Sequence, residues 1–248
     1  MLTKLLERRV IKAHCYWPNQ VNETEIFGDV SVTLISQNID ENAQIIVRQF
    51  KLTDGNQHRN MCHIHFLDWP DFGVPETTTS TLKTLELMEK FRSLYKSEPT
   101  PTPSPTLLVP DAKRKRHRSH EDMLALSAQH SLDLDDFTDA KPQKQNATVL
   151  VHCSAGVGRS GTFIAIQAYI ENLREGKPRS VKEIVSHLRK YRMCMVQTKD
   201  QYKFIYRVVE DYSSSNKEFL NGVPPSLLWG RKSSLSETHD GIPVPIYS

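Results

Sequence analysis

The sequence predicts an α/β protein, because it contains separate stretches with the periodicity of strands and of helices. Alternation or enrichment in β-branched residues, typical of strands, occurs over residues 29–36, 43–52 and 60–69. Helical spacing, or an apolar surface all round, occurs over residues 79–96, 161–174, 180–192 and 198 to about 211. The third observation is the run 149–163, in which a short apolar stretch, expected as a buried strand, passes through a glycine-rich loop into one of these helices.

The run 149–163 is typical of an anion site that carries a nucleophile. Its glycines allow the backbone to curl, so that N–H groups at a helix N-terminus point inward. Arg159 adds a planar fork of donors suited to phosphate oxygens, and Cys153 would lie at the floor, where these groups favour the thiolate. The pattern predicts attack of Cys153 on a phosphate ester. The spacing Cys-x5-Arg by itself is also compatible with another interpretation, in which Cys153 is a buried core thiol and the glycines form an ordinary turn.

The full run from His152 to Phe163, His-Cys-Ser-Ala-Gly-Val-Gly-Arg-Ser-Gly-Thr-Phe, closely resembles the signature of the classical protein tyrosine phosphatases. The resemblance implies a twisted mixed β-sheet flanked by helices, with the cysteine phosphate-binding loop between a strand and a helix. It also implies hydrolysis of phosphotyrosine in proteins through a cysteinyl-phosphate intermediate. The catalytic residues carried over from this run are Cys153, Arg159, Ser160 and His152, with Ser160 helping the thiolate to leave. The substrate-binding residues carried over from this run are Ser154, Ala155, Gly156, Val157, Gly158 and Arg159, and the same set includes Asp71 and Gln197 from two other loops.

Residues 1–18 contain mixed charges and the triplet Tyr16-Trp17-Pro18, which by pattern alone indicate a loop with an aromatic anchor. The segment is similar to the family's Glu-containing loop. The resemblance implies that Glu7 and Lys12 brace the catalytic arginine and the mobile acid loop. A solvated run of charges is the alternative.

Three strands are expected to follow. Residues 29–36 place Val30, Val32 and Leu34 on one face, and Asp54-Gly55 marks a turn. The third strand, 60–69, carries His63 and His65 at i, i+2. Without a third ligand nearby these are interpreted as ordinary strand residues, and no metal site is predicted.

The run Trp69-Pro70-Asp71-Phe72-Gly73-Val74-Pro75 predicts a loop, because it contains prolines and a glycine. By itself it indicates no more than a turn with an aspartate cap. It matches the family's acid loop, and this resemblance makes Asp71 the general acid that protonates the leaving tyrosine oxygen and then activates water. Trp69 would be a hinge and packing residue of the loop.

Residues 97–146 have a different composition, with alternating prolines, a basic run Lys113–Arg118 and an acidic stretch. We expect a disordered insertion in the domain. The basic run is interpreted as a solvated patch, with nuclear import or contact with acidic lipid or nucleic acid as alternatives. Residues 213–248 are rich in Ser, Pro and Gly and are expected to form a disordered tail.

The helices after the loop are marked by their ends. Gly176 is expected to stop the first, Ser180 opens a capping box, and Thr198 opens another. The run Val196–Tyr202 resembles the family's glutamine loop. There Gln197 would orient the hydrolytic water and Gln201 would assist, although a capping role alone is the alternative for Gln201.

The resemblance covers residues 1 to 212 with the insertion left out, as three separated motifs in the family's order. The family's amino-terminal part, including the loop whose tyrosine stacks on the phosphotyrosine ring, has no counterpart here. We therefore expect a partial catalytic domain with impaired stability and selectivity. A non-catalytic phosphotyrosine-binding or regulatory pseudophosphatase is the alternative. A dual-specificity or lipid phosphatase is disfavoured by the Trp-Pro-Asp and glutamine loops.

Composition narrows the class of protein further. The chain has 248 residues, 38% hydrophobic residues and a net charge of +3, which is too small to imply nucleic-acid binding. It has no run of about 18 apolar residues, so no membrane span is predicted. Its four cysteines show neither a zinc spacing nor a disulfide framework, which favours a reducing, cytoplasmic environment. No cofactor is predicted, phosphotyrosine-containing proteins are the expected partners, and membership of a longer receptor-type chain is left open.

Overall fold

The computed structural model describes residues 1–95 and 148–216. The chain divides into two compact units, Met1–Phe91 with Val151–Ser248, and Arg92–Leu150. The strands, the glycine-rich loop and all but the last turn of one helix lie in the first unit. The predicted insertion at 97–146, its basic run and most of the predicted tail lie outside the described residues.

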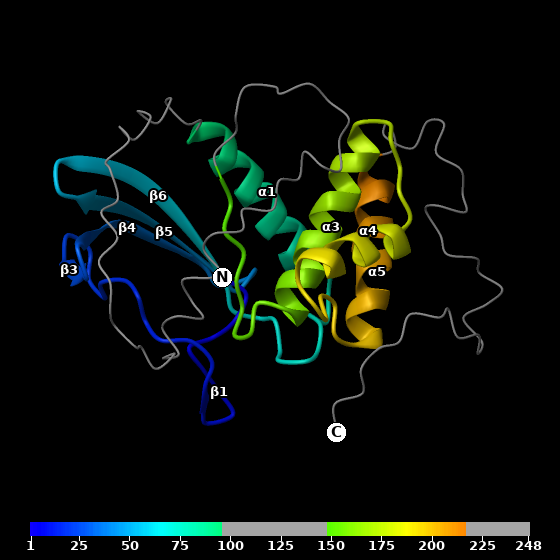
Figure 1. The fold of residues 1–248 in the computed structure, drawn as a ribbon, viewed down its shortest axis with the longest axis horizontal. Helices are drawn as coiled ribbons and strands as arrows, with labels where there is room; N and C mark the ends of the chain where they lie inside the picture. The colour runs from blue at the N-terminus through cyan, green and yellow to red at the C-terminus, as the bar shows by residue number, and fades with distance from the viewer. Residues whose placement is uncertain (96–147, 217–248) are drawn as a thin grey trace, which may run out of the picture. The chain divides into compact units, whose positions relative to one another are not determined.

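The main sheet is built from four antiparallel strands in the order β3-β4-β5-β6 (Figure 1). Their bounds are Thr24–Phe27 for β3, Val30–Asp40 for β4, Ile45–Asp54 for β5 and Gln57–Phe66 for β6. The three predicted strands are confirmed, each shifted or extended by a few residues. The predicted turn is also present, with a positive φ of 54° at Gly55. The short strand β3 was not predicted.

Residues 1–3 continue this sheet toward the glycine-rich loop. The Met1 nitrogen donates to Ile64 O at 2.8 Å, and Phe66 N donates to Met1 O at 2.9 Å. On the other side, Leu2 N donates to His152 O at 2.8 Å. These bonds fix the start of the loop against the end of β6.

The prediction of a buried strand before the loop is wrong. Residues 148–153 form no ladder, and Val149 and Leu150 are 37% and 69% exposed. The bond from Leu2 to His152 is not repeated along the segment. All strand ladders in the described ranges are antiparallel, whereas the bonds of Met1 with Ile64 and Phe66 have the pattern of a parallel bridge. The α/β class is confirmed.

The first residues also form a hairpin that the sequence did not predict. Strand β1, Leu6–Glu7, pairs antiparallel with β2, Val10–Ile11. Arg8 and Arg9 make the turn with φ of 48° and 65°. The expectation of an irregular loop over residues 1–18 is therefore corrected for residues 6–11.

The helices lie beside the sheet, with α3 as the central one (Figure 1). Their bounds are Thr79–Leu94 for α1, Gly158–Arg174 for α3, Val181–Tyr191 for α4 and Lys199–Ser215 for α5. Helix α3 contacts both α4 and α5 and is buried along almost its whole length, as its apolar surface predicts. No helix in the described ranges is long and apolar enough to cross a membrane.

Local signals set the ends of these helices. The capping boxes of Ser180 with Glu183 and of Thr198 with Gln201 are both present. Gly176, with φ of 69°, ends α3, and its N–H bonds to Leu173 O. The predicted start of α3 at residue 161 is three residues late, because the loop turns into helix already at Gly158.

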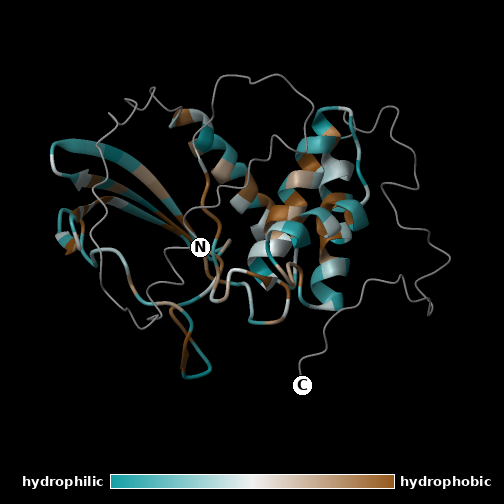
Figure 2. Ribbon diagram, in the orientation of Figure 1, coloured by the Kyte–Doolittle hydropathy of each residue, from teal (hydrophilic) through white to brown (hydrophobic). Residues whose placement is uncertain are grey.

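Hydrophobic residues gather in the helices and along the inner part of the sheet (Figure 2). One cluster on the sheet contains Met1, Trp17, Val32, Leu34 and Phe50. This confirms the predicted inward face of β4. Burial of these apolar side chains stabilises the sheet against which residues 1–3 are held.

Candidate active site

The loop between His152 and α3 has the tight curvature that its glycines predict, but the glycines serve different purposes. Gly156 has a positive φ of 68°, which L side chains rarely adopt. At positions 158 and 161 glycine is required for a different reason, because neighbouring atoms lie too close to leave room for a side chain. A Cβ at Gly158 would lie 2.5 Å from Gln197 Oε1, and one at Gly161 would lie 2.7 Å from Val196 N.

The sulfur of Cys153 lies at the floor of this loop, and the residue is 6% exposed. Burial by itself raises the pKa of this thiol. The Ser160 hydroxyl and the N–H groups of Ser160, Val157 and Gly156 outweigh that effect and lower the pKa. The buried Ser160 hydroxyl has no hydrogen-bond partner of full geometry in the described part of the chain, so it acts on the sulfur as a nearby dipole. The sulfur is therefore held toward the thiolate state.

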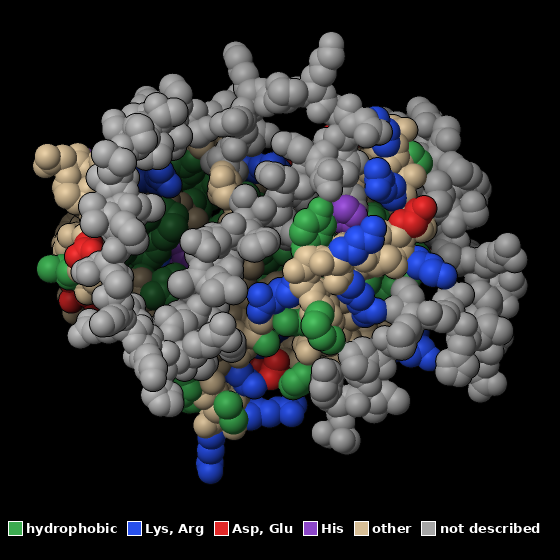
Figure 3. Space-filling model, in the orientation of Figure 1, with side chains coloured by type: hydrophobic (Ala, Val, Ile, Leu, Met, Phe, Trp, Pro, Cys, Tyr) green, Lys and Arg blue, Asp and Glu red, His purple; other side chains and the backbone are tan. Residues whose placement is uncertain are grey.

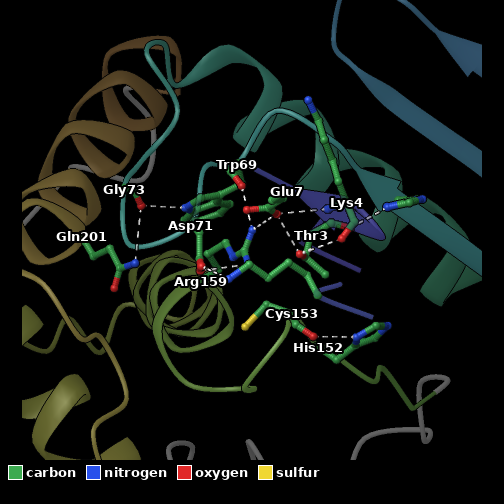
Figure 4. A network of polar contacts seen from close by, with 12 residues as sticks. Thr3, Lys4, Glu7, Trp69, Asp71, Gly73, His152, Cys153, Arg159 and Gln201 are labelled. Atoms are coloured by element: carbon green, nitrogen blue, oxygen red, sulfur yellow. Dashed lines mark hydrogen bonds and ion pairs between the residues drawn. The ribbon is translucent and has the colours of Figure 1, made fainter. Parts of the chain in front are cut away.

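Arg159 lies beside this sulfur and is fixed from the other side (Figure 4). Its side chain is 2% exposed, and Nη1 donates to Glu7 Oε1 at 2.5 Å and to Trp69 O at 3.0 Å. Nη2 donates to Asp71 Oδ1 at 3.1 Å. The guanidinium is thus oriented before any ligand arrives, which reduces the entropy lost on binding.

Asp71 lies in a loop that folds over the same place. Its carboxylate contacts Arg159 through Oδ1 and Lys12 Nζ through Oδ2, the latter at 2.5 Å. The loop is anchored by Trp69, which is 1% exposed and whose Nε1 donates to Gly73 O at 3.1 Å. Phe72, next to the carboxylate, has a φ of 58° and is 59% exposed. The loop is therefore held with its acid toward the cysteine.

The two glutamines close the third side of the site. Gln201 is fully buried, accepts from Gln197 N at 2.9 Å and donates to Gly73 O at 3.4 Å. Its side chain therefore serves both as the cap of α5 and as a link to the acid loop. Gln197 lies directly over Gly158, as the short distance to a Cβ there indicates.

These segments enclose a cavity of about 120 Å³, which is lined by Lys12, Asp71, Phe72, Cys153, Ser154, Ala155, Gly158, Arg159, Gln197 and Gln201. All of these except Phe72 were predicted from the sequence. The predicted residues Glu7, Trp69, Ser160, His152, Gly156 and Val157 do not line the cavity but contact or adjoin those that do.

His152 contacts residues that sequence patterns did not connect with the site. Tyr16 Oη lies 2.5 Å from His152 Nε2 and 3.2 Å from His63 Nε2. Burial and the nearby Met1 amino group lower the pKa of His152 to about 4, so the ring is neutral at pH 7. The triplet at 16–18 was interpreted as an aromatic anchor, but nothing in the sequence connects it with His152.

Arg192 was also missed by the sequence analysis. It lies at the end of α4, and its Nη2 donates to Ala155 O at 3.0 Å, which holds the outer edge of the loop. The contact spans 37 residues, and no motif of the sequence links the two positions.

Fold and site together define an α/β protein with a cysteine-centred anion site. A family model described as protein-tyrosine phosphatase matches residues 1–109 and 116–211. The chain therefore belongs to the protein-tyrosine phosphatase family.

Several relatives carry the same family description in their names. The chain is 33% identical over 220 residues to receptor-type tyrosine-protein phosphatase eta of Gallus gallus, covering 88% of this chain and 12% of that protein. It is 27% identical over 254 residues to tyrosine-protein phosphatase non-receptor type 61F of Drosophila melanogaster, covering 99% and 37%. It is 26% identical over 211 residues to the human tyrosine-protein phosphatase non-receptor type 2, covering 84% and 39%. The chain thus spans well under half the length of these relatives.

Proposed function

We propose that this chain hydrolyses phosphotyrosine in proteins through a cysteinyl-phosphate intermediate. One observation carries the proposal: the buried Cys153, whose pKa is lowered, shares a cavity of about 120 Å³ with Arg159 and Asp71. A nucleophile, a phosphate-binding cation and a proton donor are the groups that cleavage of an aryl phosphate needs.

In the first step the Cys153 thiolate attacks phosphorus, and the bond between phosphorus and the tyrosine oxygen breaks. Arg159 and the inward N–H groups bind the phosphoryl oxygens, and Asp71, in its protonated form, gives its proton to the tyrosine oxygen. The phosphoryl group would replace the Asp71 carboxylate as the partner of Arg159 Nη2. Glu7 and Trp69 O would hold the other nitrogen in place.

In the second step a water molecule attacks the cysteinyl phosphate. The Asp71 carboxylate takes the proton from this water, the sulfur–phosphorus bond breaks, and inorganic phosphate and the thiolate are released. Gln197 would orient the water, and Gln201 would hold Gln197 and the acid loop together. Ser160, whose hydroxyl lowers the pKa of Cys153, would stabilise the departing thiolate by donating a hydrogen bond to it.

Two variants test this mechanism on the purified chain. Cys153→Ser should abolish turnover of phosphotyrosine peptides and of para-nitrophenyl phosphate, because the hydroxyl is not ionised at neutral pH. Asp71→Ala should lower kcat by roughly 100-fold or more while peptide binding persists, because the acid acts in the transition state and not in binding. Steady-state kinetics and peptide-binding isotherms give both values.

Cys62→Ser is the matched control. Burial raises the pKa of the Cys62 thiol to about 12, so it is not a nucleophile, and its replacement should leave kcat unchanged. Turnover that survives Cys153→Ser would refute the mechanism. Peptide binding without any turnover in the unaltered chain would favour the alternative, a phosphotyrosine-binding pseudophosphatase.

A further inference from the structure

The hairpin β1–β2 carries an exposed basic turn immediately next to a residue of the site. Glu7, the last residue of β1, bonds to Arg159 at 2.5 Å. Lys12, just after β2, bonds to Asp71. Both ends of the hairpin are therefore fixed beside the cavity, and the turn made by Arg8 and Arg9 projects from the edge of the cavity. Consecutive Cα atoms are about 3.8 Å apart, so Arg8 begins one residue away from a group that touches Arg159.

The charges of this turn are not neutralised within the protein. Arg8 and Arg9 are exposed and form no ion pair within the described residues. Lys4, whose N–H bonds to Glu7, is also exposed and adds a further positive charge at the base of the hairpin. Figure 3 shows basic side chains projecting at the hairpin end. Glu7 does not offset them, because it is already paired with Arg159.

The backbone provides a second, independent observation. Arg8 and Arg9 both have positive φ, 48° and 65°. A two-residue hairpin turn of this kind is formed most easily by Asn-Gly, and each side-chain-bearing residue in the left-handed region costs about 1 kcal/mol or more. Backbone strain of this kind concentrates at functional positions. The turn therefore keeps two arginines at a cost in stability, although their side chains form no ion pair in the described chain.

We propose that Arg8 and Arg9 bind acidic residues that flank the phosphotyrosine of a substrate protein. The inference rests on the proposed function and specifies the class of substrate. An extended peptide advances about 3.3 Å per residue, so an acidic side chain about two to four residues from the phosphotyrosine would reach the turn. Opposite charges at such a rim raise the association rate and lower KM without changing the chemical step.

The test uses the double variant Arg8→Asn/Arg9→Gly in the full chain. It removes both charges but installs the turn residues that this backbone prefers, so the hairpin is retained. Phosphotyrosine peptides with acidic or neutral flanks, and para-nitrophenyl phosphate, are the substrates. The variant should raise KM for the acidic peptides by roughly fivefold to tenfold and leave the other two substrates unchanged. The double variant Arg8→Lys/Arg9→Lys should keep the preference for acidic flanks.

The same peptides are also titrated against the Cys153→Ser protein, with and without Arg8→Asn/Arg9→Gly, so that the test does not depend on turnover. The acidic peptides should bind more tightly only when the arginines are present, and added salt should reduce that difference. Equal loss for acidic and neutral peptides, no loss at all, or loss in the lysine variant would overturn the inference. Failure of turnover with the binding preference intact would refute the proposed function and leave the inference supported.

Discussion

At the scale of single residues, the state of one sulfur decides whether the site can act. Burial and hydrogen bonding affect Cys153 in opposite directions, and the Ser160 hydroxyl together with three N–H groups gives a lowered pKa. Alkylation by iodoacetate should therefore begin at a pH below the range of an ordinary thiol, because only the thiolate reacts. Ser160→Ala should move that onset to higher pH. Peptide mapping by mass spectrometry across buffers of increasing pH measures it.

Cys62, which is half-buried, supplies the internal control for this experiment. Burial raises the pKa of Cys62 to about 12, so its alkylation should stay slow where that of Cys153 is complete. Vanadate, which fits the same anion loop as phosphate, should protect Cys153 and leave Cys62 unaffected. An onset for Cys153 in the ordinary thiol range, without protection by vanadate, would contradict the electrostatic account of the site.

At the scale of elements, the first turn of α3 and the segment before α5 fit together only because residue 158 has no side chain. A methyl group at Gly158 would lie 2.5 Å from Gln197 Oε1 and 3.1 Å from the amide of Gln201. Gly158→Ala should displace Gln197 and slow hydrolysis of the cysteinyl phosphate. We expect kcat to fall by roughly 10- to 100-fold, with a burst of para-nitrophenol in stopped-flow traces.

Gly55→Ala distinguishes this effect from a general loss of stability. Gly55 has a φ of 54°, and no atom lies within 4 Å of the place that a methyl group would take, so alanine there strains the turn without approaching the site. Its kcat should equal that of the unaltered chain. A Gly158→Ala protein with normal kcat and no burst would show that hydrolysis of the cysteinyl phosphate does not require Gln197 in its present position.

The elements also show what a single sequence can and cannot predict. Long periodic segments and capping boxes, such as Ser180 with Glu183, were predicted because their signals are local. Hairpin β1–β2 was missed because strands of two residues have no periodicity and Arg8-Arg9 is not a turn signal. The apolar run before the loop was mistaken for a buried strand, although Leu150 is 69% exposed.

The residues of the site, too, were predicted only where the signal is local in the sequence. Motif residues such as Cys153, Asp71 and Gln197 were found because each lies in a run of recognisable sequence. The contact between Tyr16 and His152 joins positions 136 residues apart. Such a pair is created by the fold, and no spacing in one sequence reports it. The contact of Arg192 with Ala155 is missed for the same reason.

At the scale of the whole molecule, stability should depend on pH through histidines buried in the sheet. His63 and His65 on β6 are 7% and 3% exposed. Burial, together with the positive charges of Arg48 and the Met1 amino group, lowers the pKa of both, that of His65 to about 4. The unfolded chain binds these protons near pH 6.5, whereas the folded chain does not. The contribution of these two histidines to the free energy of unfolding therefore falls as the pH drops through 6.5 toward 4, by up to about 1.4 kcal/mol per pH unit for each histidine. His152, with a pKa of about 4, acts in the same direction, and so does the Met1 amino group, whose pKa burial lowers from 8.0 to about 5.

Urea unfolding at a series of pH values measures this slope. His65→Gln should reduce the slope of unfolding free energy against pH by the contribution of one histidine, because an amide cannot titrate. The amide can still donate to Thr3 O, which His65 contacts at 2.7 Å. The comparison of slopes is insensitive to any constant loss of stability that the substitution itself causes, since a constant offset does not change with pH. Stability that stays flat between pH 6.5 and 5, or an equal slope in the His65→Gln protein, would mean that these histidines accept protons inside the fold and that the sheet beside the catalytic loop is open to water.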